Sequence, residues 1–160
     1  MNKPLKAVAL LLALGSVSCS LIRRADPVTQ TSGIELQVEV VAANLDTIWD
    51  MVWAPDGDMW ITERGGHVSR INLVTGQVMT VGVIDVHEQG ESGLMGMAFH
   101  PEFATEPWVY LAHSFDDGEG IRNRLIRTRY ENGRLGPPET LLDEVPGRSN
   151  HDGSRLVIGP

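Results

Sequence analysis

Short runs of alternating or continuously apolar residues, each bounded by turn residues, make up the chain from residue 34 onward. Residues 34–40 (IELQVEV) alternate apolar and polar side chains strictly, which predicts a strand with one buried face. No stretch after residue 34 keeps a helical period for three turns, so we do not expect helices to form the scaffold. The pattern therefore predicts an all-β protein whose strands are joined by short turns.

A four-strand unit recurs along the chain. The first unit has strands at 51–53, 59–62, 67–72 and 77–81, and the second at 93–100, 108–112, 124–130 and 139–142. A third unit begins at residues 155–160. Four-stranded units repeated at roughly 40–50 residues are typical of a β-propeller. We therefore expect about two blades plus the start of a third, with a β-sandwich as the alternative.

The first strand of the second unit is apolar on both of its faces. Residues 94–99 (LMGMAF) contain no charged side chain, and Gly96 and Ala98 are small enough for neighbouring chains to approach closely. This pattern predicts an inner blade strand, buried on both sides and close to the propeller channel.

The N-terminal segment has the layout of a secretory signal. Lys3 and Lys6 precede eight apolar residues, 7–14, and small residues follow at 15–18. The apolar run is too short to span a membrane, which takes about 20 residues. We expect a signal peptide at 1–18, a polar tether at 19–37, and the N-terminal part of a truncated propeller domain at 38–160.

Cys19 is the only cysteine, so the chain cannot close an internal disulfide. It directly follows the small residues of the predicted signal, and this context resembles a bacterial lipoprotein processing site at which the cysteine is lipidated. Ser16 stands where such sites usually carry Leu, so an unlipidated exported protein is the alternative. Either way we expect export, to the bacterial periplasm or to a lipid anchor on the cell envelope.

The charge balance excludes one class of partner. The 160 residues carry 13 Lys and Arg against 21 Asp and Glu, a formal net charge of −8. Binding along a phosphate backbone requires a basic face, so we do not expect a nucleic-acid partner.

The residue spacings in this chain do not match those of several known catalytic and ligand-binding motifs. Gly90, Gly93 and Gly96 do not form the dinucleotide-binding fingerprint, and the acidic stretch 116–120 lacks the ligand pattern of an EF-hand, which favours a solvated loop. Four of the five histidines are expected at the surface or in structural roles, at positions 67, 87, 100 and 113. His151 differs, because it lies in a polar loop, 147–155 (GRSNHDGSR), just before the third unit. Spacing alone leaves open both a functional and a structural role for it.

Three ordered blocks of residues resemble the soluble glucose/sorbosone dehydrogenase family, the exported quinoprotein aldose dehydrogenases. The blocks are 53–64 (WAPDGDMWITER), 90–103 (GESGLMGMAFHPEF) and 151–160 (HDGSRLVIGP). The resemblance implies a six-bladed propeller that binds pyrroloquinoline quinone (PQQ) and Ca²⁺ and oxidises the C1 hydroxyl of aldoses to lactones. It also implies a sugar substrate and an external electron acceptor.

The resemblance assigns roles to individual residues. His151 falls at the general base, Glu91 where sugar-oxidising members often have a Gln that contacts the ligand, and Asn150 where some have an Asp beside the base. Ser154 replaces a frequent Gly. The residues that bind PQQ and Ca²⁺ are expected beyond Pro160, so no metal ligand is expected in this portion.

Two alternative functions remain on the sequence alone. One is a propeller that only binds a carbohydrate or a protein. The other is a calcium-dependent lactonase-like hydrolase, which would need carboxylate ligands inside the channel, where Glu63 and Glu91 are the plausible ones.

Overall fold

The computed structural model describes residues 36–159. The chain divides into two units, and all the strands lie in the second, Val38–Pro160. The predicted signal peptide and Cys19 lie outside the described residues. Within residues 36–159 no helix is long and apolar enough to cross a membrane. The described part is built entirely from strands and the turns between them, which confirms the all-β prediction.

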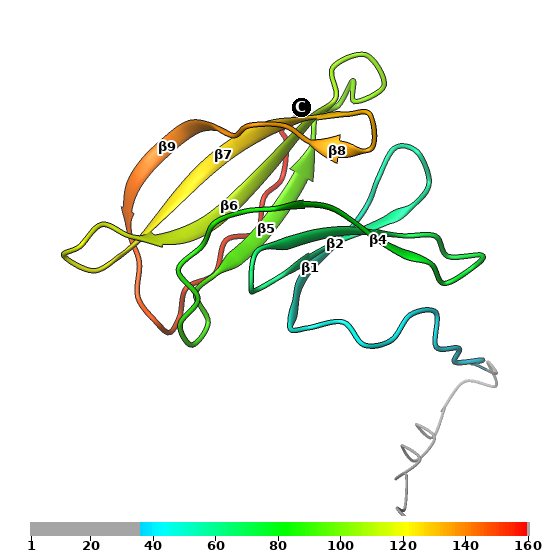
Figure 1. Ribbon diagram of the computed structural model, residues 1–160, viewed down its shortest axis with the longest axis horizontal. Helices are drawn as coiled ribbons and strands as arrows, with labels where there is room; N and C mark the ends of the chain where they lie inside the picture. The colour runs from blue at the N-terminus through cyan, green and yellow to red at the C-terminus, as the bar shows by residue number, and fades with distance from the viewer. Residues whose placement is uncertain (1–35, 160) are drawn as a thin grey trace, which may run out of the picture. The chain divides into compact units, whose positions relative to one another are not determined.

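The first sheet is a four-stranded antiparallel meander (Figure 1). Its strands pair in chain order, and each is joined to the next by a short turn. Gly57 and Gly66 have φ angles of 91° and 102°, which glycine reaches without a steric penalty. The strands are β1 (Ile48–Trp53), β2 (Met59–Glu63), β3 (His67–Ile71) and β4 (Val78–Val83).

The second sheet repeats this order with one addition. Strands β5, β6, β7 and β9 pair antiparallel, and the short β8 pairs with the end of β7. The sequence predicts all of these strands except β8, although β6, β7 and β9 extend further than expected. Their bounds are β5 (Leu94–Phe99), β6 (Trp108–Asp116), β7 (Ile121–Glu131), β8 (Arg134–Leu135) and β9 (Glu139–Pro146).

The strand predicted at residues 34–40 is wrong over its described part. Residues 36–43 form no strand, and the side chain of Val38 is 91% exposed. Alternation of apolar and polar residues creates a strand only where a neighbouring strand accepts the backbone hydrogen bonds. No described strand pairs with this segment.

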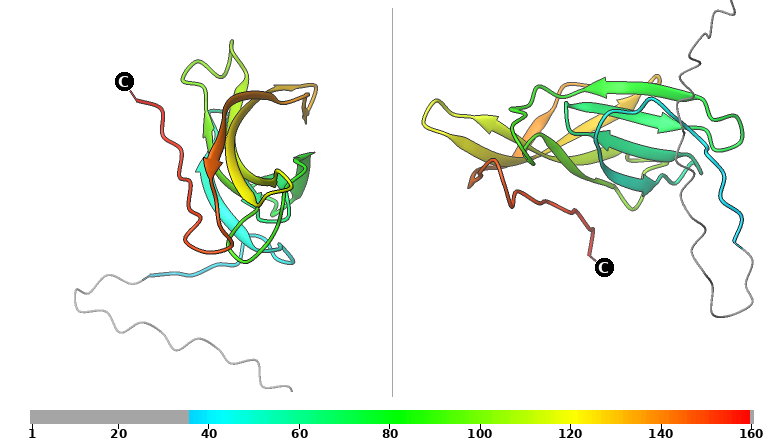
Figure 2. Two further views of the ribbon diagram at one scale, coloured as in Figure 1. Left: turned by 90° about the vertical axis from the view of Figure 1, so that its left-hand side faces the viewer. Right: turned by 90° about the horizontal axis from the view of Figure 1, so that it is seen from below.

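The strand predicted at the start of a third unit is also not formed. Residues 153–159 are extended but unpaired, and Figure 2 shows them as a trace outside both sheets. They nevertheless lie close to β5, because a Cβ atom built on Gly96 would overlap the backbone carbonyl of Ser154. The prediction that Gly96 permits a close approach of backbone is therefore confirmed.

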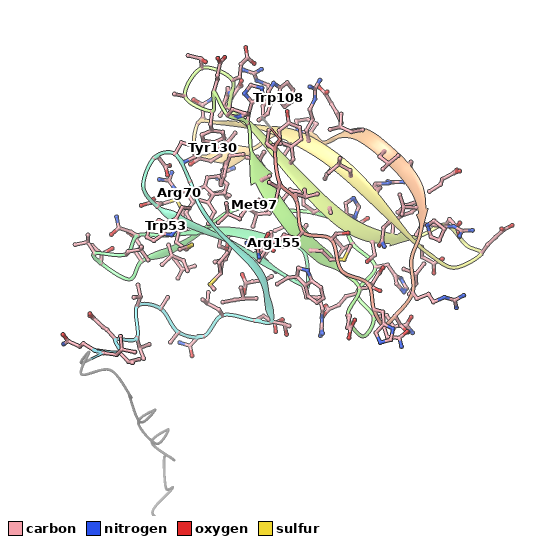
Figure 3. The ribbon with its side chains drawn as sticks, turned by 180° about the vertical axis from the view of Figure 1, so that it is seen from behind. Trp53, Arg70, Met97, Trp108, Tyr130 and Arg155 are labelled. Atoms are coloured by element: carbon pink, nitrogen blue, oxygen red, sulfur yellow. The ribbon has the colours of Figure 1, made fainter. Side chains whose placement is uncertain are left out.

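The hydrophobic core lies between the two sheets. Every residue of β5 is buried, as its two apolar faces predict. Trp60 is fully buried, with ring centroids 5.2 Å from Phe99 and 4.9 Å from Tyr130. Arg70 of β3 donates to the hydroxyl of Tyr130 at 2.6 Å, and Figure 3 shows the two side chains together. These contacts join the two sheets into one packed unit.

A buried carboxylate also connects the sheets. Asp50 of β1 accepts a hydrogen bond from the backbone N–H of Met97 in β5 at 3.1 Å. Thr62 of β2 donates its hydroxyl to the carbonyl of Met95 at 2.6 Å. Both bonds satisfy backbone groups of β5 at the point where its register with β6 shifts, so they compensate for an interrupted ladder.

His113 is buried rather than at the surface, which corrects the sequence prediction. It lies in the middle of β6 opposite Leu94, and only 4% of the residue is exposed. The acidic loop was expected to begin just after this position, but β6 continues to Asp116 and carries His113 into the core. Burial lowers the pKa of the imidazole, and its hydrogen bond to the Ser114 carbonyl opposes that shift.

The buried His113 predicts that the protein loses stability in mild acid. Its pKa is lower in the folded than in the unfolded state, so the unfolded state binds a proton first as the pH falls through 6.5. We expect the melting temperature to fall between pH 7.5 and 5.5, and His113→Gln to reduce that fall. The exposed His67→Gln is the matched control. Equal pH dependence in the wild type and His113→Gln would contradict this assignment.

Candidate active site

Four turns meet at one end of the two sheets, at the lower left of Figure 1. Backbone hydrogen bonds hold the turns against one another or against adjacent strand ends: Leu94 to Arg64 at 2.9 Å, Glu91 to Ser149 at 2.8 Å, and Gly147 to Ile121 at 3.1 Å. The turns comprise residues 64–66, 84–93, 116–120 and 147–153. Glu91, Asn150 and His151, the three predicted site residues in the described part, all lie on them.

The 84–93 turn is fixed from the side of the first sheet. Arg64, directly after β2, donates to Glu88 at 2.9 Å and to the carbonyl of Gly90 at 2.5 Å. Gly90 has a φ of 64°, and a Cβ atom built on it would overlap the carbonyl oxygen of Ser149. Glycine at this position therefore allows the 84–93 turn and the 147–153 loop to touch through their backbones.

Glu91 contacts His151, but through the backbone of the histidine. A carboxylate oxygen of Glu91 accepts the N–H of His151 at 2.5 Å, while the N–H of Glu91 donates to the Ser149 carbonyl at 2.8 Å. The φ of His151 is 57°, in the left-handed region. The imidazole is not used in this clamp, and His151 is exposed at the surface of the loop.

Asp152, the residue after His151, is buried. One of its carboxylate oxygens accepts from the amide of Asn123 at 2.5 Å, and the other lies 3.1 Å from the hydroxyl of Ser92. The same hydroxyl reaches the carbonyl of Arg148 at 2.6 Å. Sequence reasoning missed these three side chains. The available signals were a polar Asn between Ile121 and Leu125 on one face of β7 and a Ser two residues before the buried strand β5.

Asn150 lines a shallow hollow between the 116–120 turn and the 147–153 loop. The hollow has a volume of about 380 Å³. His151 follows Asn150 in the chain but is not among the residues that line it. Its walls are polar or charged apart from Ile121 and two glycines: Glu119, Arg122, Arg148, Ser149 and Asn150.

The charges of this region bear on cofactor binding. PQQ is an anion and requires cations. Arg148, exposed on the same loop as His151, forms no ion pair with any described residue, whereas Arg122 is already paired with Asp117 at 2.7 Å. The donor set thus fits one edge of a site for an anionic cofactor.

The described residues do not form a calcium site. No group of three or more potential ligands among His, Cys, Asp and Glu occurs within residues 36–159. Glu63 accepts the backbone N–H of Asp46 at 2.7 Å, and Glu91 accepts that of His151. Each of the two carboxylates expected of a lactonase therefore binds a backbone amide in the described structure.

Comparison with known proteins identifies the class. The sequence matches the Glucose / Sorbosone dehydrogenase family over residues 45–160, and the chain belongs to this family. It is 34% identical over 178 residues to quinoprotein glucose dehydrogenase B of Acinetobacter calcoaceticus, a match that covers 100% of this chain and 37% of the relative.

Two solved structures resemble the fold. The PQQ-bound aldose sugar dehydrogenase of Streptomyces coelicolor is 28% identical with a TM-score of 0.71, over 77% of this chain and 38% of that one. The apo form of the soluble aldose sugar dehydrogenase of Escherichia coli is 30% identical with a TM-score of 0.66, over 75% of this chain and 37% of that one. The chain thus spans little more than a third of these relatives. The two sheets are blades of a β-propeller, as the repeat predicts.

Proposed function

We propose that the protein is a quinoprotein oxidoreductase that oxidises the C1 hydroxyl of aldose sugars to lactones with PQQ as cofactor. One observation carries the proposal: in a chain of the glucose/sorbosone dehydrogenase family, the loop that bears His151 is held at Ser149, at the N–H of His151 and at Asp152, and residue 151 is exposed. The names of the relatives, glucose and aldose sugar dehydrogenases, support the substrate class.

His151 is the general base in this proposal. Oxidation of a C1 hydroxyl removes a hydride from carbon and a proton from oxygen, and the neutral imidazole of His151 takes the proton. When bound, PQQ would supply the hydride acceptor, and an external electron acceptor would then take up the two electrons. A positioned base typically contributes about 10²–10⁴-fold to such a step.

Glu91 and Asn150 serve the same site in different ways. Glu91 holds the backbone of His151, because its carboxylate accepts a hydrogen bond from the His151 N–H in the absence of any ligand. Asn150 lines the hollow beside the loop, where its amide would contact sugar or cofactor. Arg148 is the cation on this edge that would pair with a carboxylate of PQQ.

Calcium is assigned to residues outside 36–159. The described part offers no ligand cluster, so no step of the reaction is derived through the ion.

The function is tested with a panel of aldoses. The full-length protein that contains this chain is loaded with PQQ and Ca²⁺, supplied with an artificial electron acceptor, and assayed for lactone by chromatography. We expect sugar-dependent lactone formation that stops when PQQ is omitted. Sugar binding without turnover would instead establish a binding propeller, and lactone hydrolysis without PQQ would establish a hydrolase.

We further propose export, with residues 1–18 as a cleaved signal, 19–37 as a tether and 38–160 as propeller. We expect the processed protein outside the cytoplasm, with the mass of a chain whose first residue is Cys19. Cell fractionation of the wild type and Cys19→Ala distinguishes the two forms of export. A lipid anchor requires wild type in the membrane fraction and Cys19→Ala in the soluble periplasm. Full precursor mass in the cytoplasm would contradict export.

A further inference from the structure

We propose that Asp152, Asn123 and Ser92 form a buried anchor that positions His151 for its role as base. Asp152 is the central residue of this anchor. The anchor itself is independent of the reaction, but its catalytic consequence rests on the proposed function. The three side chains come from the 147–153 loop, from β7 and from the turn before β5.

The burial of Asp152 is the first argument. Only 5% of this residue is exposed, and no Arg, Lys or His among the described residues forms an ion pair with it. An ionised carboxylate is costly to bury, and here neutral donors alone compensate for the lost water. A loop residue at the molecular surface could point outward at no such cost. Buried charges of this kind can be retained because they fix one conformation, and we apply that explanation here.

The position of the anchor is the second argument. The loop is held at Ser149 before the histidine, at the N–H of His151 itself, and at Asp152 directly after it through the amide of Asn123. The single hydroxyl proton of Ser92 lies within reach of both the Arg148 carbonyl and Asp152. A left-handed backbone at a histidine persists where the surroundings over-determine it. The anchor and the Glu91 clamp together supply that constraint. His151 is exposed, so the backbone of the loop fixes the direction of its Cα–Cβ bond and hence the region that the imidazole can reach.

The orientation of Asn123 is the third argument. Its amide oxygen is buried and has no hydrogen-bond partner, while its amide nitrogen donates to Asp152 at 2.5 Å. The contact with the carboxylate thus determines which way the amide points, even though the oxygen is left unsatisfied. The roles of donor and acceptor can be exchanged between residues 123 and 152, and the experiment uses this exchange.

Asn123→Asp is the disruptive variant, because it places a second carboxylate against Asp152. The double variant Asn123→Asp/Asp152→Asn restores the pair with donor and acceptor exchanged, while the oxygen of the new amide can still accept from Ser92. Asn132→Asp is the matched charge control, since Asn132 is exposed in the turn between β7 and β8 at the other end of the sheet.

The first readout is amide hydrogen exchange at His151 in the PQQ-free protein, where activity plays no part. We expect exchange to accelerate at least about 10-fold in Asn123→Asp and to return to within about twofold of wild type in the double variant. Asn132→Asp should exchange like the wild type. An unchanged His151 amide in Asn123→Asp overturns the proposal. If Asn123→Asp fails to fold, the proposal is tested with the double variant alone. A double variant that is unfolded, or whose His151 amide is unprotected, also overturns the proposal.

The second readout separates positioning from general stability. In the PQQ-loaded protein we expect Asn123→Asp to lower kcat about 10-fold with the KM for sugar and the affinity for PQQ nearly unchanged, and the double variant to recover kcat. Restored hydrogen exchange without restored kcat would overturn the positioning role. If the wild type oxidises no sugar, the proposed function fails, while the hydrogen-exchange result still tests the anchor.

Discussion

Replacement of His151 by Gln is expected to slow sugar-dependent reduction of bound PQQ by about 10²-fold or more while the affinity for PQQ is retained. Glutamine keeps the polarity and the approximate size of histidine but accepts no proton at neutral pH. The clamp from Glu91 binds the backbone N–H of residue 151, so it persists in the variant.

His67→Gln is the matched control for this experiment. His67 is an exposed histidine at the start of β3, so the same chemical change there should leave the rate within about twofold of wild type. Rapid mixing and optical detection of PQQ reduction give both rates. Equal rates for the wild type and His151→Gln would remove His151 from the mechanism.

Trp60→Ala is expected to lower the free energy of unfolding by about 3–5 kcal/mol. Trp60 is 0% exposed and packs edge-to-face against Phe99, Phe103 and Tyr130 of the neighbouring blade. Truncation removes this large apolar area and leaves a cavity that flanking strands, fixed by their ladders, can fill only in part. The guanidinium of Arg70, 5.9 Å from the ring centroid, loses its aromatic neighbour as well.

Trp53→Ala provides the comparison for Trp60. Trp53 is on the adjacent strand β1 but is 62% exposed, so its loss should cost about 1 kcal/mol or less. Urea unfolding of both variants gives the two free energies. Similar values would contradict the assignment of Trp60 to the contact between the blades.

The strand order was predictable because its signals are local. Gly57 and Gly66 occupy turn positions with positive φ, and residues 94–99 are apolar on both faces, so turn chemistry and side-chain pattern agree. The failures occur where a distant partner decides. Residues 36–40 alternate perfectly but have no neighbouring strand, and His113 is buried because β6 extends to Asp116.

The site was predictable only in part. A polar loop before a repeat unit, together with the family resemblance, singled out His151. Its contact with Glu91 joins residues 60 positions apart, and no periodicity or spacing encodes that distance. Nothing in the sequence distinguishes Asp152 from an ordinary loop carboxylate. Its contacts with Ser92 and Asn123 form only when the chain is folded.

Single-turnover reduction of PQQ tests the central claim most directly. The full-length protein that contains this chain is loaded with PQQ and mixed with excess aldose in the absence of any electron acceptor, and the absorbance of the cofactor is followed. We predict stoichiometric reduction by at least one aldose, with lactone formed in equal amount. A protein with verified, stoichiometric PQQ that no aldose reduces would contradict the account and favour a binding propeller.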